Sequence, residues 1–321
     1  MFGRLAKPEV VGFGHILYDL RCYVENFPKP DKTSFVRGKM KGSVGGSATN
    51  VVCNLAKLGK KTAILGKVGF DENGEFALRS LRKLGVETSG VKIDQKHPTG
   101  LSIVVIDKKG QPAVVEMLGA NERIEPREIS FSLINSAKIV HLTGAPVRRL
   151  EEVSEYAKSL GKTVAFDPGR SISRLGYKAL EKTLRNSDIL IINRKEAAEL
   201  GGPDRLKKLL PDKTIVIKGG KKPTILYDPK DCAFLEIGTY PVAVRDTLGS
   251  GDAFSAGFIA KLLEGEPIWQ AVSYANACGA LKATREGADG LPHRDEVDDF
   301  YRKHRGKVRI VCRKKAKLGG F

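Results

Sequence analysis

Hydrophobic and polar positions along most of the chain follow two alternating periods. Short apolar runs predict buried strands at 10–13, 62–65, 138–142, 163–166, 189–192 and 214–218. Apolar residues at helical spacing predict helices at 47–58, 73–84, 150–160, 196–200, 252–263 and 268–284. Gly59, Gly85 and Gly161 stand where three of these helices end. Strands that alternate with helices indicate βαβ units, so we expect an α/β fold with a mostly parallel sheet flanked by helices.

Two stretches interrupt this rhythm. Residues 22–41 lack a helical pattern and contain Pro28 and Pro30, and residues 91–118 favour two strands, 101–107 and 113–118, around a turn. We expect the two insertions to combine into one small β-sheet that serves as a lid. The expected division of the chain is a large catalytic domain (1–20, 44–90 and 120–300), a β-lid (21–43 and 91–119) and a basic C-terminal tail (301–321).

Composition narrows the class of protein. The 321 residues are 41% hydrophobic and 29% charged, which supports a large core and excludes a disordered or membrane-spanning chain. The first residues lack a basic segment followed by an apolar one, so we expect no signal peptide and no membrane partner. Five widely spaced cysteines without a Cys-x-x-Cys pair predict a reducing, cytoplasmic location.

The net charge of +18 is concentrated at the C-terminus. Residues 301–321 contain no acidic residue and nine basic ones, namely Arg302, Lys303, Arg305, Lys307, Arg309, Arg313, Lys314, Lys315 and Lys317. Such a segment can attract nucleic acid non-specifically, and the alternative is a solvated end of the chain. Alternation in 308–312 also predicts a terminal strand.

The segment from Asp246 to Asp252 is the strongest candidate for chemistry. Gly249, Ser250 and Gly251 are small residues directly before a predicted helix, so their backbone amides can converge on an anion such as a phosphate. Asp252 lies at the mouth of that site and could accept a proton from an incoming hydroxyl group. The alternative is structural, with Asp252 as the N-cap of the helix.

A second glycine-rich segment precedes the helix predicted at 47–58. Gly45 and Gly46 would let a ligand approach the backbone closely. Asn50, about one turn into the helix, offers both a donor and an acceptor, as a polyhydroxylated ligand requires. The alternative is a glycine-rich turn before a helix capped by Ser47.

Asn193 and Glu196 follow the strand predicted at 189–192. They could form a capping box, with Asn193 as the N-cap. They could also face a ligand at the carboxyl edge of the parallel sheet, where Glu196 would hold magnesium through water. Asp19 follows the first strand and is expected at the same edge or in a surface loop.

The order of these segments resembles the ribokinase family of PfkB-type carbohydrate kinases. The resemblance is carried by Gly45-Gly46, by Gly66 to Gly74, by Asn193 to Glu196 and by Asp246 to Asp252, and it covers about residues 8–295. It implies a ribokinase-like fold and ATP-dependent phosphorylation of a hydroxyl group. Lys222 stands where the family usually has a second glycine, three positions after Gly219, and Asp167 to Arg170 is only a shortened version of a family element.

The resemblance also implies roles for individual residues. Asp252 would be the general base, and Gly249, Ser250 and Gly251 the anion hole. The acceptor would be held by Asp19, Gly45, Gly46 and Asn50, and the nucleotide by Asn193, Lys218, Gly219 and Asn276. Magnesium would be held by Glu196 through water, and Asp246 with the backbone of Leu248 resembles part of a potassium site.

The sequence leaves several candidates for the molecule that accepts the phosphoryl group. A ribose-like sugar comes first, a nucleoside second, and a phosphorylated pentose is a third alternative because the body of the protein is basic. A nucleic-acid-binding protein with a vestigial kinase fold is the alternative from another class, and the intact Asp252, Asn193 and Glu196 argue against it. Family members commonly pair lid against lid, so the resemblance implies a homodimer.

Overall fold

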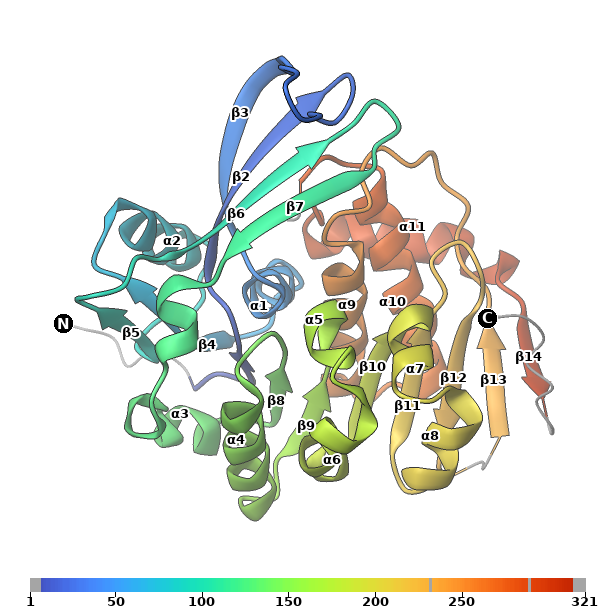
Figure 1. Cartoon of the computed structure of the whole chain (residues 1–321). Helices are drawn as coiled ribbons and strands as arrows, with labels where there is room; N and C mark the ends of the chain where they lie inside the picture. The colour runs from blue at the N-terminus through green and yellow to red at the C-terminus, as the bar shows by residue number, and fades with distance from the viewer. Residues whose placement is uncertain (1–6, 231–232, 288–289, 314–321) are drawn as a thin grey trace.

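The computed structural model describes residues 7–230, 233–287 and 290–313, which form a large α/β body and a small separate sheet (Figure 1). The large sheet has ten strands among these residues, in the order β14-β13-β12-β11-β10-β9-β8-β1-β4-β5. Its strands are β1 (Val10–Phe13), β4 (Thr62–Gly69), β5 (Val91–Asp94), β8 (Ile139–Leu142), β9 (Thr163–Phe166), β10 (Ile189–Asn193), β11 (Thr214–Lys218), β12 (Thr224–Asp228), β13 (Ala233–Ile237) and β14 (Ile310–Arg313).

The sheet is parallel from β5 to β11 and antiparallel from β11 to β14. Its central strands are buried on both faces, which is why they read in the sequence as continuous apolar runs. The predicted α/β architecture with a mostly parallel sheet is therefore confirmed.

Helices cover both faces of the large sheet (Figure 1). One core joins the sheet to apolar side chains such as Leu150, Leu180 and Leu206, and the other joins it to side chains such as Val51, Phe258 and Val272. The helices are α1 (Ser47–Lys57), α2 (Glu72–Lys83), α3 (Phe131–Ser136), α4 (Val147–Ser159), α5 (Gly169–Ser173), α6 (Gly176–Asn186), α7 (Arg194–Glu199), α8 (Pro203–Leu209), α9 (Ser250–Leu263), α10 (Ile268–Ala283) and α11 (Arg294–His304). Within the described ranges, no helix has both the length and the apolar character needed to cross a bilayer.

The small sheet consists of β3 (Val36–Gly45), β2 (Leu17–Val24), β6 (Gly100–Ile106) and β7 (Pro112–Met117), in that order. The two insertions therefore do combine into one sheet, and this sheet stands over one end of the large body (Figure 1). We call it the lid.

The expected boundaries of the lid need three corrections, of which the first is that β3 extends to Gly45 and adds residues 44 and 45 to the lid. Strand β2 starts at Leu17, so Asp19 belongs to the lid and not to the carboxyl edge of the first strand. Strand β5 pairs with β4, so residues 91–94 extend the large sheet. In each case pairing with strands far away in the chain decides which sheet the residues join.

The basic segment at the C-terminus contributes to the large body. Residues 301–304 complete α11, and β14 pairs antiparallel with β13 at the edge of the large sheet. The terminal strand predicted at 308–312 is thus present at 310–313. Lys314, Lys315 and Lys317 lie outside the described residues.

Candidate functional site

Three neighbouring strands of the large sheet end in polar residues. Asp167 directly follows β9, Asn193 ends β10, and Lys218 ends β11. The strands run parallel, and Asn193 is opposite Lys218 in the register. These side chains therefore lie at the same edge of the sheet, where ligands of open α/β sheets bind.

Asp252 projects from the first turn of α9 and meets the other glycine-rich segment. The Nδ2 of Asn50 donates to Oδ2 of Asp252 at 2.8 Å, although the two residues are 202 positions apart. The helix begins at Ser250 with Gly249 as its N-cap at φ 74°, so the interpretation of Asp252 as the N-cap is wrong. The side chain of Asp252 is free to act in the site instead of closing the helix.

The surroundings of Asp252 raise its pKa to about 6. Burial is the main cause, and the negative charge of Asp167 adds to it. Hydrogen bonds from Asn50 and Ser47 and the charge of Lys218 act in the opposite direction. The carboxyl group is therefore still ionised at neutral pH but binds a proton more readily than an exposed aspartate.

Backbone amides at the start of α9 are available beside this carboxylate. Ser250 N donates to the carbonyl oxygen of Thr247 at 3.1 Å. The amides of Gly249 and Gly251 have no acceptor within the described parts of the chain. A Cβ atom built on Gly251 would lie 3.6 Å from Nζ of Lys218, so a cationic group stands next to these amides. Free amides, a helix N-terminus and a lysine together favour an anion at this position.

Gly45 leaves room for the carboxylate of Asp19 on the neighbouring strand of the lid. A Cβ atom at Gly45 would lie only 2.1 Å from Oδ1 of Asp19, so any larger residue would displace that carboxylate. Gly46 has φ 94° and lies against the carbonyl oxygen of His15. It is also the N-cap of α1, so Ser47 is the first residue of the helix and not the cap that the sequence suggested.

Asp19 reaches the site from the lid. Its pKa is raised to about 7, mainly by burial and further by the charges of Glu116 and Asp252, while Arg21 opposes the shift. The charges of Arg21 and Asp252 thus both lie near enough to Asp19 to affect its pKa. The structure thus brings Asp19, Gly45, Asn50 and Asp252 together.

Asn193 and Glu196 form the capping box that the sequence allowed. Oδ1 of Asn193 accepts from the amides of Lys195 and Glu196, and Asn193 N donates to Oε2 of Glu196 at 2.8 Å. Glu196 is also buried, and its pKa is raised by that burial and by the charge of Asp167, against the effect of Lys218. It therefore combines a structural contact with a place in the charged cluster.

Asp167 is the site residue that the sequence reasoning left out. Its Oδ2 accepts from Nζ of Lys218 at 2.7 Å and from Oγ of Ser255 at 3.2 Å. Burial lowers the pKa of Lys218, but the charges of Asp167 and Glu196 outweigh it and raise the pKa overall. Asp167 could have been found from its place directly after a buried parallel strand, the same signal that singled out Asn193.

A cavity of about 450 Å³ opens beside the start of α9. It is lined by Lys218, Gly219, Ser250, Gly251 and Asn276, which include three residues expected at the nucleotide. The side chain of Asn276 is already engaged, because Oδ1 accepts from Thr224 and Nδ2 donates to Gly238 O at 2.9 Å. Asn276 therefore shapes the wall of the cavity by holding two backbone segments in place.

Asp246 holds the loop before α9. Its Oδ1 accepts from Leu248 N at 2.8 Å, and its Oδ2 accepts from Gly287 N at 2.9 Å. The ammonium group of Lys282, which is completely buried, donates to the carbonyl oxygen of Asp246 at 2.8 Å. A positively charged group is thus already present at the place where the resemblance implied potassium.

The chain matches a known protein family over most of its length. The family model described as pfkB family carbohydrate kinase matches residues 7–294. The chain belongs to the pfkB family of carbohydrate kinases. Most of the described body, the lid included, lies within the match.

Individual relatives give this assignment more detail. The chain is 36% identical to the ATP-dependent ribose-1-phosphate kinase of Halopiger xanaduensis, over 91% of this chain and 97% of the relative. It is 27% identical to a nucleoside kinase of Methanothermobacter thermautotrophicus, over 87% of this chain and 90% of that protein. The structure of Arabidopsis thaliana ribokinase complexed with ribose and ATP superposes with a TM-score of 0.79 at 24% identity, covering 92% of this chain and 99% of that one. The ribokinase-like fold is thereby confirmed.

Proposed function

We propose that this chain transfers a phosphoryl group from ATP to a hydroxyl group of a pentose. The observation that carries the proposal is the 2.8 Å hydrogen bond between Asn50 and Asp252. It supports the proposal because Asp252, which is joined to Asn50, lies in the first turn of α9 beside Gly249 and Gly251, whose amides have no acceptor among the described residues. An acceptor hydroxyl at this position would have a base on one side and an anion-binding site on the other.

Each of the grouped residues then has a separate task. Asp252 accepts the proton of the attacking hydroxyl, and Asn50 and Asp19 orient the sugar through hydrogen bonds. The amides at the start of α9 and Lys218 stabilise negative charge on the transferring group. Closure of the lid, which carries Asp19, would exclude water that could otherwise hydrolyse the donor.

Magnesium fits the same arrangement. Glu196 would hold the ion through water, since Mg²⁺ keeps several waters and uses few protein carboxylates together with the phosphates. Its oxygen Oε1 makes no hydrogen bond within the described ranges, which leaves it open toward a hydrated ion. When bound, the ion neutralises charge on the nucleotide phosphates.

The acceptor is chosen from the relatives and the polar groups of the site. A relative at 36% identity is named for ribose 1-phosphate, so we place ribose and ribose 1-phosphate first. A nucleoside is the second candidate because another relative of similar coverage is named a nucleoside kinase.

A panel assay tests this proposal. The purified chain, with ATP or ADP as donor and MgCl₂, is offered ribose, ribose 1-phosphate and a set of nucleosides, and the product nucleotide is quantified. We expect ATP-dependent turnover of one of the two pentoses. Turnover of none of these compounds would contradict the kinase assignment and favour the vestigial fold.

Location and assembly are part of the same proposal. The widely spaced cysteines support a reducing cytoplasm, and Cys22, Cys53, Cys278 and Cys312 are free thiols. We also propose a homodimer that forms through the lid, and we treat its test below.

A further inference from the structure

Arg21 is a buried arginine whose charged group is largely unpaired. The residue is only 5% exposed, yet neither its Nε nor its Nη1 has a hydrogen-bond partner in the described parts of the chain. Nη2 contacts Oγ of Ser43 at a long 3.4 Å. A buried guanidinium without acceptors is costly, and its five donors normally meet carboxylate or phosphate oxygens.

Arg21 lies on the same face of the lid as Asp19, and its charge lowers the pKa of that carboxyl group. Asp19, Arg21 and Tyr23 alternate along β2 and therefore share one face of the lid. The negative charge of Asp252 contributes to the raised pKa of Asp19, so Asp19 lies near the proposed base. Arg21 is thus two positions further along the lid than the carboxylate that we assign to the sugar.

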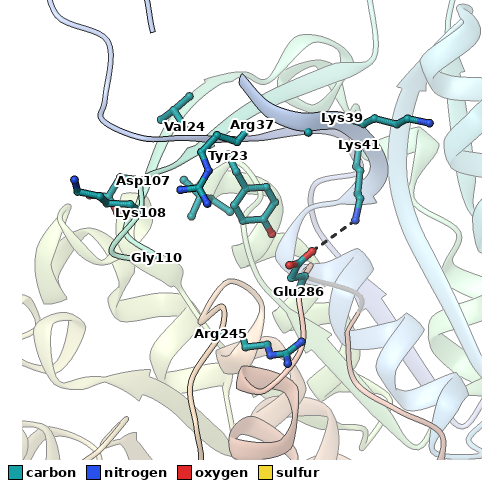
Figure 2. Close-up of a pocket in the computed structure, with 12 residues that line it drawn as sticks. Tyr23, Val24, Arg37, Lys39, Lys41, Asp107, Lys108, Gly110, Arg245 and Glu286 are labelled. Carbon is teal, nitrogen blue, oxygen red and sulfur yellow. Dashed lines mark ion pairs between the residues drawn. The ribbon is translucent and has the colours of Figure 1, made fainter. Parts of the chain in front are cut away.

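Two neighbours of Arg21, namely Tyr23 on the same strand and Lys41 opposite it on β3, line a cavity of about 390 Å³ (Figure 2). Basic side chains line it from the lid and from the large body, namely Arg37, Lys39, Lys41, Lys108 and Arg245. The hydroxyl of Tyr23 is buried there and has no partner among the described residues. Lys41, opposite Arg21 in the β2–β3 register, points toward Glu286 at 3.6 Å. An anionic substituent would satisfy Arg21 and the hydroxyl of Tyr23 together.

We infer that Arg21 binds a phosphate group carried by the acceptor, so that the acceptor is a sugar phosphate whose free hydroxyl lies at the end toward Asp252. This inference rests on the proposed kinase activity. The acceptor would bridge the lid and the large body, with its phosphate at Arg21 and its reacting hydroxyl at Asp252. A guanidinium is suited to this task because it recognises phosphate oxygens in a two-pronged geometry.

The test compares ribose 1-phosphate with ribose in the wild type and in Arg21→Met. We expect the wild type to prefer ribose 1-phosphate. In the variant, kcat/KM for ribose 1-phosphate should fall by roughly 10- to 150-fold, the usual worth of a hydrogen bond to a charged group. The loss should appear mainly in KM and should be at least about tenfold larger than the loss for ribose. Arg79→Met on α2 is the control, since Arg79 is exposed, is paired with Glu75 and does not line the cavity.

Other results would overturn the inference. Equal losses for the two pentoses would mean that Arg21 only supports the lid, for instance by pairing with Glu116 when the lid closes. If the wild type phosphorylates neither pentose, the proposed function fails, and calorimetry with ribose 1-phosphate still decides the role of Arg21. Binding that is weakened in Arg21→Met supports the inference, and binding that is unchanged overturns it.

An independent observation concerns Lys282 on α10. Its ammonium group is 0% exposed, donates to the carbonyl oxygen of Asp246 at 2.8 Å and lies 3.9 Å from Oδ2 of the same residue. Asp246 and Leu248 are the residues at which the resemblance implied potassium. A potassium ion is coordinated by carbonyl and carboxylate oxygens. Here the carbonyl oxygen of Asp246 already accepts a hydrogen bond from the ammonium group of Lys282.

We propose that Lys282 supplies a built-in positive charge at this loop and that turnover does not require potassium. The ammonium group of Lys282 donates a hydrogen bond to the carbonyl oxygen of Asp246. The carboxylate of Asp246 in turn accepts hydrogen bonds from the amides of Leu248 and Gly287. The loop leads directly into the amides at the start of α9. A fixed charge here would hold the anion-binding amides in place without an exchangeable ion.

Activity and thermal stability in different chloride salts test this second proposal. We expect wild-type turnover and Tm to be the same, within about twofold and 1 °C, in potassium, sodium and tetramethylammonium chloride, since no ion binds the folded state. Lys282→Met should lose turnover, and potassium should restore part of it and raise the Tm of the variant. Lys67→Met removes another buried, ion-paired lysine and should show no potassium response.

The wild-type measurement is decisive even if Lys282→Met does not fold. A wild-type enzyme that potassium activates more than about fivefold, or whose Tm potassium raises, would overturn the proposal. A folded Lys282→Met variant with normal turnover in every salt would overturn it as well.

Discussion

At the scale of single residues, burial raises the pKa of three acidic groups of the site, whereas a fourth acidic group forms an ion pair. Burial raises the pKa of Asp252 to about 6 and that of Asp19 to about 7, and it also raises the pKa of Glu196. Asp167 instead forms an ion pair with Lys218 at 2.7 Å. Groups with elevated pKa values are suited to proton transfer, and an ion-paired carboxylate is suited to holding a lysine in position.

Replacement of Asp252 by asparagine tests the base. In Asp252→Asn the new amide oxygen can still accept the hydrogen bond from Asn50, but the side chain cannot take a proton at neutral pH. We expect kcat to fall by about 10²–10⁴ with Tm unchanged. Steady-state kinetics and a thermal melt of the same sample check this, with Asp204→Asn on α8 as the control. Near-normal turnover in Asp252→Asn would refute the assignment.

The pH dependence follows from the raised pKa values. An acid with a raised pKa is protonated below that value, so its carboxylate is lost as the pH falls. We expect kcat/KM to decrease through about pH 7 and again below about pH 6, as Asp19 and then Asp252 bind protons. Asp167 and Lys218 face Asp252 and set its value together with burial. In Asp19→Asn only the lower step should remain, and a flat profile down to pH 5 would contradict the prediction.

Glu196 has both a structural and a proposed magnesium role, and a conservative substitution separates the two. Glutamine can still accept from Asn193 N, so Glu196→Gln should fold normally. We expect a several-fold higher magnesium requirement with little change in the acceptor KM. A magnesium titration of the wild type, Glu196→Gln and the control Glu199→Gln checks this. If the Glu196→Gln curve matches the wild type, Glu196 only caps α7.

At the scale of elements, one helix and one edge strand matter most. Helix α9 is capped by Gly249 in the left-handed region, its Gly251 amide has no acceptor among the described residues, and Asp252 lies in its first turn. Strand β14 covers β13 at the end of the large sheet through four register pairs. An unpaired edge strand exposes backbone groups, so β14 protects that edge.

Truncation of the C-terminus tests the role of β14. Removing residues 310–321 should lower Tm by several degrees, because the β13 edge loses its partner, while turnover at 25 °C stays within about twofold. Removing only residues 314–321 keeps every described strand and serves as the control. A large loss of turnover at unchanged Tm would show that this segment reaches the site.

At the scale of the whole molecule, the lid presents an apolar outer face. Val115 is 71% exposed and Met117 46% exposed on β7. They lie opposite Ile103 and Leu101, and Ile103 lies beside Leu20, so this face is the reverse of the one that carries Asp19. Exposed apolar side chains that share one face of a sheet favour association.

A charged substitution on this face tests the proposed homodimer. We expect light scattering at micromolar concentration to give a dimer for the wild type and a monomer for Val115→Asp. Leu175→Asp changes an equally apolar, 53% exposed residue on the large body and should leave the dimer intact. A monomeric wild type would rule the interface out.

Much of the fold could be predicted from local patterns. The buried strands at 10–13, 163–166 and 214–218 match the predicted runs, because a strand covered on both faces needs apolar residues at every position. The helices α6 and α8 and the antiparallel strands β12 and β13 were not predicted. Their patterns are short, and packing against the large sheet decides them.

The sequence by itself determined the α/β class, the two glycine-rich segments and most of the polar residues at the site. Tertiary structure alone decided which of these residues meet. It joined Asn50 to Asp252, moved Asp19 into the lid, and paired Asp167 with Lys218 and Lys282 with Asp246. Local periodicity records which face of an element is buried, whereas contacts between residues far apart in the chain depend on strand register and helix packing. Those arise only when the whole core assembles.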